Sequence, residues 1–515
     1  MKKSIIIDGR KYLKLDDCHE IARNMTNVMF EDKKLAEKSH KILEQLQDKR
    51  VPIYGLTTQF GSQGHIFDNK LEAEDKIYRQ SIRERQENLI KSFECGLGDI
   101  MPIDVIRATM FLRANCLARG CSGVRPEVID MLVKFLNHRI HPIIYHYGSI
   151  GASGDLIPLS AIASVLFGFS EYALLENKME KTVNIFKKFN IKPIDIESRD
   201  GLALMNGTSF MTAIAALAMY DLKIMFPQLL RGIAITLEAL AIYDDGYQPF
   251  VHIQKHHGGQ KMVAEIIRNQ WRGSRLIRNK QNNNTLNKTV GLQDYYSLRA
   301  LAHGFGPFYE NLQSSTKWIE NEMNSINDNP IFDDKYTIYH SANFMGYYIT
   351  EAADIMKIDI AQASSWVHSI LANLYNVRKS GGLPDNLVIK ENTHHGFKSI
   401  QILSAALAVQ NRKLAHSQQN FMIPTEGDNQ DVNSLGTHAA LDFYEAVKNL
   451  ERLTAIVFLS AAQALEIRGI AKAGKVSQKI HALIRKQVAF LKKDRNMRVD
   501  IERVIGLIQR EEFKF

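Results

Sequence analysis

The chain has 515 residues, of which 45% are hydrophobic and 23% are charged, and this balance excludes a mainly disordered protein. A chain of this length is too long to fold around a single hydrophobic core, so we expect two or three packed regions. The formal net charge is +9, but the lysines and arginines are spread along the sequence without a nucleic-acid-binding motif, so we expect no nucleic-acid partner.

The N-terminal part of the sequence predicts short, mixed elements. Ser4–Ile7 is typical of a short strand, and Leu15 begins a pattern typical of a helix start. The first apolar run is too short for a signal peptide, and the four cysteines form no CxxC pair, so we expect reduced thiols in a cytoplasmic protein. Residues 51–69, rich in Gly, Thr, Ser and Gln, predict turns, and Ile103 to Asn137 has the apolar spacing of a helix.

The middle and C-terminal parts are dominated by helical patterns. The most apolar stretch, Thr208 to Tyr243, is interrupted by charged residues and a proline, so we expect core helices and no membrane span. Long patterns rich in Ala and Leu, which predict the helices of a bundle, cover residues 349–377, 397–421 and 438–467. Gly469 is typical of a helix stop, and the polar stretch Asn279–Asn287 predicts a mobile loop.

These patterns predict a mainly α fold, with a mixed N-terminal region followed by a long central helical bundle. The change from mixed structure to long helices predicts two domains, residues 1–200 and residues 201–515. The sequence has no metal-binding or nucleotide-binding motif, so we expect neither kind of ligand.

A glycine-rich stretch around Ala152-Ser153-Gly154 has two interpretations. Alone, the tripeptide predicts only a turn before a helix over Asp155–Phe167, with Pro158 in its first turn. The second interpretation is chemical. Attack of the Gly154 amide nitrogen on the Ala152 carbonyl carbon, with loss of water, closes an imidazolone ring, and loss of the Ser153 hydroxyl leaves an electrophilic methylene group. That chemistry needs a small residue, a β-hydroxyl residue and glycine in a strained turn.

The run from Gly148 to Leu159 resembles the signature of the histidine, phenylalanine and tyrosine ammonia-lyases, which use a methylidene-imidazolone cofactor. Further blocks resemble this family in the correct order along the chain: Tyr54–Thr58, Arg113–Asn115, Arg119–Arg125, Gly201–Thr208, Gln293–Arg299, Asn327–Pro330, Asn343-Phe344 and Asn429–Gly436. The resemblance implies a fumarase/aspartase-like helical fold and non-oxidative elimination of ammonia from a small-molecule aromatic amino acid. It also implies a homotetramer whose active sites are shared between subunits.

The resemblance also implies roles for single residues. Tyr54 is expected to be the general base, with its pKa lowered by positive surroundings or hydrogen bonds. Asn206 is expected to bind the cofactor's carbonyl oxygen, and Arg299 to hold the substrate carboxylate, with Tyr296 on the same helix face. The expected catalytic residues are Tyr54, Ala152, Ser153, Gly154, Asn206 and Tyr296, and the expected substrate-binding residues are Ser92, Phe93, Gln293, Arg299, Phe332, Asn343 and Gln430.

The substrate prediction depends on a few side chains. The resemblance implies that Ser92 and Phe93 occupy the positions that contact the substrate ring, and histidine lyases and some tyrosine lyases place a histidine where Phe93 stands. Gln430 stands where histidine lyases tend to have glutamate. An apolar Phe93 leaves a polar ring unpaired, so we expect phenylalanine first, tyrosine second and histidine third. The alternatives are a histidine ammonia-lyase that forms urocanate, an aromatic aminomutase, and a catalytically silent helical scaffold.

Two positions depart from the family pattern. Gln59 stands in the loop Thr58-Gln59-Phe60-Gly61, where the family usually has glycine. After Arg299, the step Ala302-His303 replaces the usual Pro-Gln. These changes indicate either a tolerated local repacking or an altered substrate or activity.

Overall fold

The computed structural model describes residues 4–68, 71–279, 292–389 and 393–514. The chain folds into two compact units, each gathered from three segments. Unit 1 contains Met1–Tyr220, Thr316–Ala353 and Ser417–Leu441, and unit 2 contains Asp221–Ser315, Asp354–His416 and Asp442–Phe515. The predicted domain boundary near residue 200 stays a prediction.

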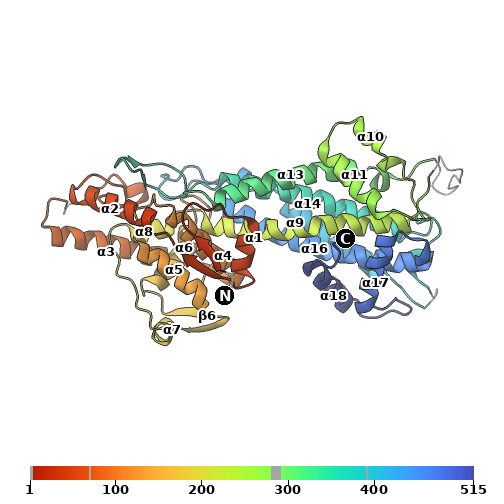
Figure 1. Ribbon diagram of the computed structural model, residues 1–515, viewed down its shortest axis with the longest axis horizontal. Coiled ribbons are helices and arrows are strands. Elements are labelled where there is room, and N and C mark those ends of the chain that lie inside the picture. The colour runs from red at the N-terminus through yellow and green to blue at the C-terminus, as the bar shows by residue number, and fades with distance from the viewer. Residues whose placement is uncertain (1–3, 69–70, 280–291, 390–392, 515) are drawn as a thin grey trace. The chain divides into compact units, whose positions relative to one another are not determined.

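The predicted mainly α fold is confirmed, and unit 1 also carries small sheets (Figure 1). Its helices are α1 (Leu15–Ala22), α2 (Lys34–Asp48), α3 (Asp75–Phe93), α4 (Ile103–Ala118), α5 (Pro126–His138), α6 (Leu156–Leu166), α7 (Thr182–Phe189) and α8 (Asp200–Met205). Its strands are β1 (Ser4–Ile7), β2 (Asn27–Phe30), β3 (Leu97–Ile100), β4 (Ile140–His141), β5 (Tyr145–Tyr147), β6 (Tyr172–Leu175), β7 (Lys178–Lys181), β8 (Ile331–Phe332) and β9 (Ile338–Tyr339).

The sheets of unit 1 are short and pair distant segments. β1 pairs with β2 in parallel, with Ser4 opposite Asn27, and β3 pairs with β5 in antiparallel fashion. Strands β4, β6 and β7 form an antiparallel sheet in that order, and β8 pairs with β9. The strand predicted at Ser4–Ile7 is confirmed.

The helix predicted from Ile103 to Asn137 is wrong as a single element. It is divided into α4 and α5 by a turn in which Gly120 and Gly123 have φ values of +71° and +69°. Such values are left-handed and favour glycine, and Pro126 then begins α5 because a first-turn proline sacrifices no helical hydrogen bond. Apolar spacing alone cannot show this break, because both helices are apolar.

A hydrophobic cluster lies beneath the loop that carries Tyr54. Ile53 and Leu56, on either side of Tyr54 and Gly55, are fully buried. They belong to a cluster with side chains from α2, α3 and β8, namely Ile42, Leu43, Leu46, Tyr78, Ile82 and Phe332. Burying each large apolar side chain contributes about 1.5–3 kcal/mol, so this loop is fastened from below although it has little regular structure.

Unit 2 is helical throughout its described part, and it shares its longest helices with unit 1. The shared helices are α9 (Ser209–Ala239), α13 (Leu301–Met323), α14 (Tyr347–Leu374) and α16 (Gly436–Arg468). The others are α10 (Pro249–Ile253), α11 (Gly258–Gln270), α12 (Tyr296–Arg299), α15 (Lys398–Leu414), α17 (Lys475–Gln487) and α18 (Arg498–Gln509).

Within unit 2 the long helices pack side by side as a bundle (Figure 1). Phe226 of α9 packs against Phe308 of α13 with ring centroids 4.8 Å apart, and Phe305 of α13 packs against Trp366 of α14. Between α14 and α16, the Tyr375 hydroxyl, directly after α14, hydrogen-bonds the Ser460 hydroxyl at 2.5 Å. The predicted bundle is therefore observed in this unit.

The predicted long helices are confirmed, with one change at an end. α14 and α16 lie within a few residues of their predictions, and Gly469, with φ +96°, follows α16. α15 ends at Leu414, and residues 418–421 form a 3-10 turn instead of continuing it. α9 is long and apolar enough to cross a membrane, but 78% of its most apolar window is buried in the protein, as in a core helix. The loop predicted at Asn279–Asn287 lies, from residue 280 on, outside the described residues.

Candidate active site

The Ala152-Ser153-Gly154 tripeptide lies in a turn that only glycine can close. Gly154 has φ +70°, and a β-carbon added there would overlap the carbonyl group of Gly207. The Asp155 backbone N–H donates to that same carbonyl at 2.8 Å. The tripeptide therefore lies directly against the Asn206-Gly207 segment, and helix α6 begins immediately after it.

Two amide side chains converge on Ser153 from different segments. The Asn206 Nδ2 group, at the end of α8, donates to the Ser153 carbonyl oxygen at 3.1 Å. The Gln430 Nε2 group donates to the Ser153 hydroxyl at 2.9 Å. The Asn206 carbonyl oxygen Oδ1 is buried and has no hydrogen-bond partner among the described residues. A buried acceptor without a hydrogen bond lowers the stability of the fold by about 1–3 kcal/mol. A donor group placed beside Asn206 Oδ1 would therefore be bound favourably.

Asp155 holds the segments around the tripeptide together. Its fully buried carboxylate accepts from the Ser149 hydroxyl at 2.8 Å and the Thr437 hydroxyl at 2.6 Å. It also accepts from the backbone N–H groups of Phe210 and Met211 in the first turn of α9. Burial raises the pKa of Asp155 above its usual value, and these hydrogen bonds offset only part of that rise. The carboxylate thus joins the glycine-rich turn to the start of α9 and to α16.

The Tyr54 hydroxyl is held in a tight loop. It accepts a hydrogen bond from the Gly61 backbone N–H at 2.6 Å, and its ring packs edge-on against Phe60. The Glu426 carboxylate lies next to Gly61, where it accepts the Ser62 backbone N–H at 3.1 Å. Burial raises the pKa of Tyr54, the Gly61 N–H lowers it, and the Glu426 charge raises it. In the chain alone the pKa of Tyr54 is therefore raised, because burial outweighs the hydrogen bond, and its expected lowering in the complete site stays a prediction.

Ser92 and Phe93, at the end of α3, line a hollow of about 620 Å³ beside the Tyr54 loop. Gln59, one of the two departures from the family pattern, lines the same hollow together with Phe60 and Asn88. The expected ring-contacting pair and the loop departure therefore lie on one surface. Gln59 therefore lies where it can influence what enters the hollow.

Phe332 lies beneath the Tyr54 loop, and neither Phe332 nor Asn343 touches the tripeptide in any described contact. Phe332 is 3% exposed and belongs to the cluster beneath the Tyr54 loop, where the Arg199 guanidinium stacks on its ring at 5.7 Å. Asn343 is exposed and donates to the backbone carbonyl of Ile326 at 3.0 Å. Their substrate-binding roles stay predictions.

Gln293, Tyr296 and Arg299 belong to unit 2, where Tyr296 and Arg299 form α12. The Arg299 guanidinium lies over the Tyr296 ring at 4.7 Å, as the helical spacing predicts. The Tyr296 side chain is 75% exposed, a high value for an aromatic residue with an expected catalytic role. Asn206 and Gln430 contact Ser153, and Tyr54 belongs to the same unit 1, whereas Gln293, Tyr296 and Arg299 belong to unit 2.

The α12 turn is fixed by side chains from other parts of unit 2. The Tyr247 hydroxyl donates to the Leu298 carbonyl, and Trp366 Nε1 donates to the Ser297 carbonyl at 2.8 Å. The Arg299 Nε group donates to the Asp294 carbonyl at 2.9 Å. His303, the second departure, lies in α13 with its ring 5.6 Å from that of His252, and its Nδ1 atom is buried without a hydrogen-bond partner among the described residues.

Sequence reasoning missed several residues that hold this site. Glu426 and Thr437 contact the loop and Asp155, Gln86 joins Gly55 to Leu202, and His340 accepts the Tyr54 backbone N–H. Each lies far along the chain from its partner, so no local pattern marks it. Only the position of Thr437, directly after the block that ends at Gly436, offers a weak signal.

The chain is similar to known proteins along nearly its whole length. The sequence profile described as aromatic amino acid lyase matches residues 13–486. A histidine ammonia-lyase from Treponema denticola is 32% identical over 513 residues, which cover 99% of this chain and 97% of that protein. A solved tyrosine aminomutase from Streptomyces globisporus is 30% identical with a TM-score of 0.91, covering 99% of this chain and 98% of that one. A phenylalanine aminomutase from Pantoea agglomerans is 27% identical with the same TM-score, over 99% and 100%.

Proposed function

Because the chain belongs to the aromatic amino acid lyase family, as an ammonia-lyase family enzyme, we propose that it eliminates ammonia from an aromatic α-amino acid to give the aryl acrylate. We further propose that its electrophile is a methylidene-imidazolone formed from Ala152, Ser153 and Gly154. The observation that carries the proposal is the convergence of Asn206 and Gln430 on Ser153, at 3.1 and 2.9 Å.

The residues around the tripeptide fit such a group. Gly154 admits no β-carbon, so its amide nitrogen is free of side-chain crowding. Asn206 Nδ2 already donates to the carbonyl oxygen of Ser153, which becomes the ring carbonyl, so this donor is in place for the charge that develops there. When formed, the group supplies an electrophilic carbon that draws electrons from the bound substrate, so that ammonia can leave.

Tyr54 is proposed to remove the β-proton through its hydroxyl oxygen. The Gly61 N–H donates to this oxygen and stabilises its deprotonated form. Burial and Glu426 oppose ionisation of Tyr54 in the chain alone, and positive charge near the phenol would favour it. Arg299, proposed to hold the substrate carboxylate, carries such a charge.

The exposure of Tyr296 supports the proposal that active sites are shared between copies in a homotetramer. Tyr296 is 75% exposed although the resemblance implies a catalytic role, and the Arg299 beside it belongs to the same turn. A residue that completes the site of another copy is expected to be exposed within its own chain.

The substrate is the open part of the proposal. The name of the relative from Treponema denticola favours histidine, whereas an apolar Phe93 in the hollow favours an apolar ring such as that of phenylalanine. The names of the two solved structures favour a second candidate function, an aminomutase, which returns ammonia to the β-carbon of the acrylate. In that case the product is a β-amino acid.

One set of measurements tests these proposals. The intact mass of the purified protein should fall short of the sequence mass by two waters, and Ser153→Ala should abolish that deficit. Incubation with histidine, phenylalanine and tyrosine separately should release ammonia and an ultraviolet-absorbing acrylate with at least one of them. Asn206→Ala should lower kcat by about 100-fold or more, since one oxyanion donor is lost.

Each outcome decides between the candidates. The amino acid that is turned over fastest shows which aromatic ring the site prefers. A β-amino acid found by chromatography identifies an aminomutase. A folded protein with an unmodified Ser153 hydroxyl and no ammonia release would contradict both candidates and support the scaffold alternative.

A further inference from the structure

His340 makes a contact with the Tyr54 loop to which neither the sequence nor the family resemblance assigns a role. Its Nε2 atom accepts the backbone N–H of Tyr54 at 3.2 Å. No other described contact accepts this N–H, so the imidazole satisfies it. His340 directly follows strand β9 and precedes Ser341, so the contact joins two segments about 286 residues apart in the chain.

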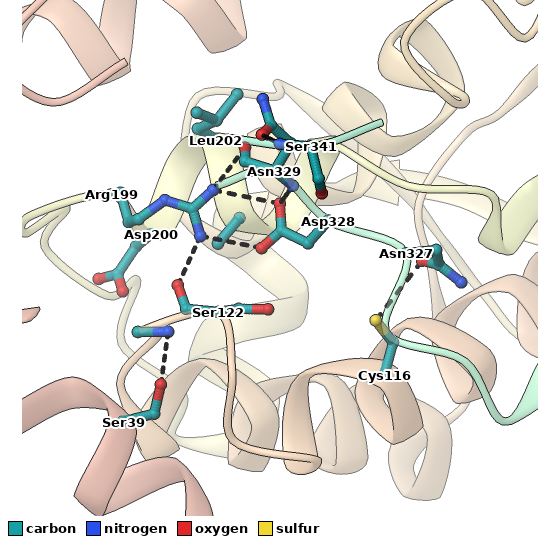
Figure 2. A network of polar contacts seen from close by, with 12 residues as sticks. Ser39, Cys116, Ser122, Arg199, Asp200, Leu202, Asn327, Asp328, Asn329 and Ser341 are labelled. Carbon is teal, nitrogen blue, oxygen red and sulfur yellow. Dashed lines mark hydrogen bonds and ion pairs between the residues drawn. The ribbon is translucent and has the colours of Figure 1, made fainter. Parts of the chain in front are cut away.

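The segment that presents His340 is firmly anchored. The Ser341 backbone N–H donates to Asn329 Oδ1 at 2.7 Å, and the Asn329 backbone N–H donates to Asp328 Oδ1 at 2.7 Å. Asp328 in turn receives both guanidinium arms of Arg199 at 2.9 and 3.1 Å, with both side chains fully buried (Figure 2). This buried, bidentate ion pair is a firm support for the segment that carries His340. Breaking it would leave an unpaired buried charge, which is costly.

The arrangement also fixes the chemical form of the imidazole. To accept an N–H, the Nε2 atom must carry a lone pair, so the ring is neutral with its proton on Nδ1. Although His340 is exposed, partial burial of its ring, and then the Arg199 charge, lower its pKa, which favours that form. The ring thus acts as a stable acceptor at ordinary pH.

We propose that His340 is a positioning residue that holds the Tyr54 backbone so that the Tyr54 hydroxyl stays aimed at the substrate's β-carbon. This inference rests on the proposed function, because it takes Tyr54 as the base. The hydrogen bonds on either side of Tyr54 support it. The hydroxyl is fixed by the Gly61 N–H and the backbone by His340, so the side chain is held at both ends.

The test compares two substitutions at one site. His340→Gln keeps a neutral acceptor at about the distance of Nε2, whereas His340→Phe keeps the ring and loses the acceptor. His138→Phe is the matched control, because His138 is an exposed histidine of α5 elsewhere in unit 1. All three proteins are first compared with the wild type by intact mass, where the loss of two waters should be unchanged.

Two readouts follow. Without substrate, amide hydrogen exchange at Tyr54 should accelerate about three- to tenfold in His340→Phe and stay close to wild type in His340→Gln and in the control. With substrate, kcat should fall by a similar factor in His340→Phe while KM changes less, because a displaced base impairs the chemical step more than binding. His340→Gln should recover most of kcat.

Equal exchange in His340→Phe and wild type, or no recovery of kcat in His340→Gln, would overturn the positioning role. The exchange readout needs no turnover. If the wild type released no ammonia from any aromatic amino acid, the proposed function would fail. The exchange measurement would still show whether His340 holds the backbone N–H of Tyr54.

Discussion

At the scale of single residues, the site is built from groups whose neighbours are as important as their own chemistry. Tyr54 is a phenol with its pKa raised by burial, and the Glu426 carboxylate beside Gly61 raises it again. Glu426 therefore has two effects. It fastens the loop by accepting the Ser62 N–H, and it opposes the ionisation that a base requires.

Replacing Glu426 by glutamine should separate these effects. The amide oxygen of glutamine can still accept the Ser62 N–H, but its negative charge is gone, so the pKa of Tyr54 should fall. Since a base acts in its deprotonated form, the rise of kcat/KM with pH should move to lower pH in Glu426→Gln. A profile that keeps its position, or moves to higher pH, would contradict this electrostatic role.

Glu322 is a second carboxyl near the site whose pKa is perturbed. It accepts the Thr208 hydroxyl at 2.5 Å, and burial raises its pKa from 4.5 to about 7. A carboxyl with a raised pKa favours folding most when both states are protonated, below about pH 4.5. That contribution is lost as pH rises through about 7. The full loss amounts to about 3 kcal/mol, an upper value.

Glu322→Gln should therefore flatten the dependence of stability on pH. The amide can still accept the Thr208 hydroxyl but does not ionise, so the variant should gain stability relative to wild type as the pH rises from 4.5 to 7.5. Thermal unfolding at several pH values measures this, at one protein concentration. A stability difference that does not change with pH would show that Glu322 titrates normally.

At the scale of elements, α12 shows how a very short helix can be made rigid. Four residues cannot stabilise themselves as a helix, and the turn is instead held by Tyr247, Trp366 and the Asp294 carbonyl. The guanidinium of Arg299 is thus aimed by side chains from α14 and from the segment before α10.

Removing one of these hydrogen bonds should weaken substrate binding. Tyr247→Phe keeps the buried ring against Trp271 and loses only the bond to the Leu298 carbonyl. We expect KM to rise about two- to tenfold with kcat less affected, because Arg299 is proposed to hold the substrate carboxylate. Tyr339→Phe, which loses an exposed hydrogen bond to Asp333, is the matched control and should leave KM unchanged.

The elements also show how far the sequence could predict the protein. The long helices and the turn before α6 follow from periodicity and glycine placement, and the motif resemblance identifies Ser153, Asn206 and Gln430. Apolar periodicity does not show the break between α4 and α5, because it depends on glycines with φ values near +70° between two helices that are both apolar. His340 was missed because its role depends on a contact between loops, which no local pattern records.

At the scale of the whole molecule, the expected site residues fall in two groups. Tyr54, Asn206 and Gln430 belong to unit 1, and Tyr296 and Arg299 to unit 2. If sites are shared between copies, a defect in one group can be compensated by a second chain that is intact there.

Co-expression of two inactive variants tests this sharing. Tyr54→Phe and Arg299→Ala chains should each have little activity alone. Mixed assemblies should recover up to about a quarter of wild-type activity, because random assortment gives that share of sites two intact groups. Each variant purified separately and mixed only at assay is the control. Mixed assemblies that stay inactive would place both residues in sites formed by one chain.

The turn at Gly154 has one more consequence. Its closure needs the Gly207 carbonyl, Asp155 and the start of α9 to have come together, so the proposed ring can form only in a chain that has folded. The loss of two waters is covalent and survives later denaturation. In a heated or aged sample, the share of chains that carry the mass deficit should therefore record how many had ever reached the native state, independently of how many are native when measured.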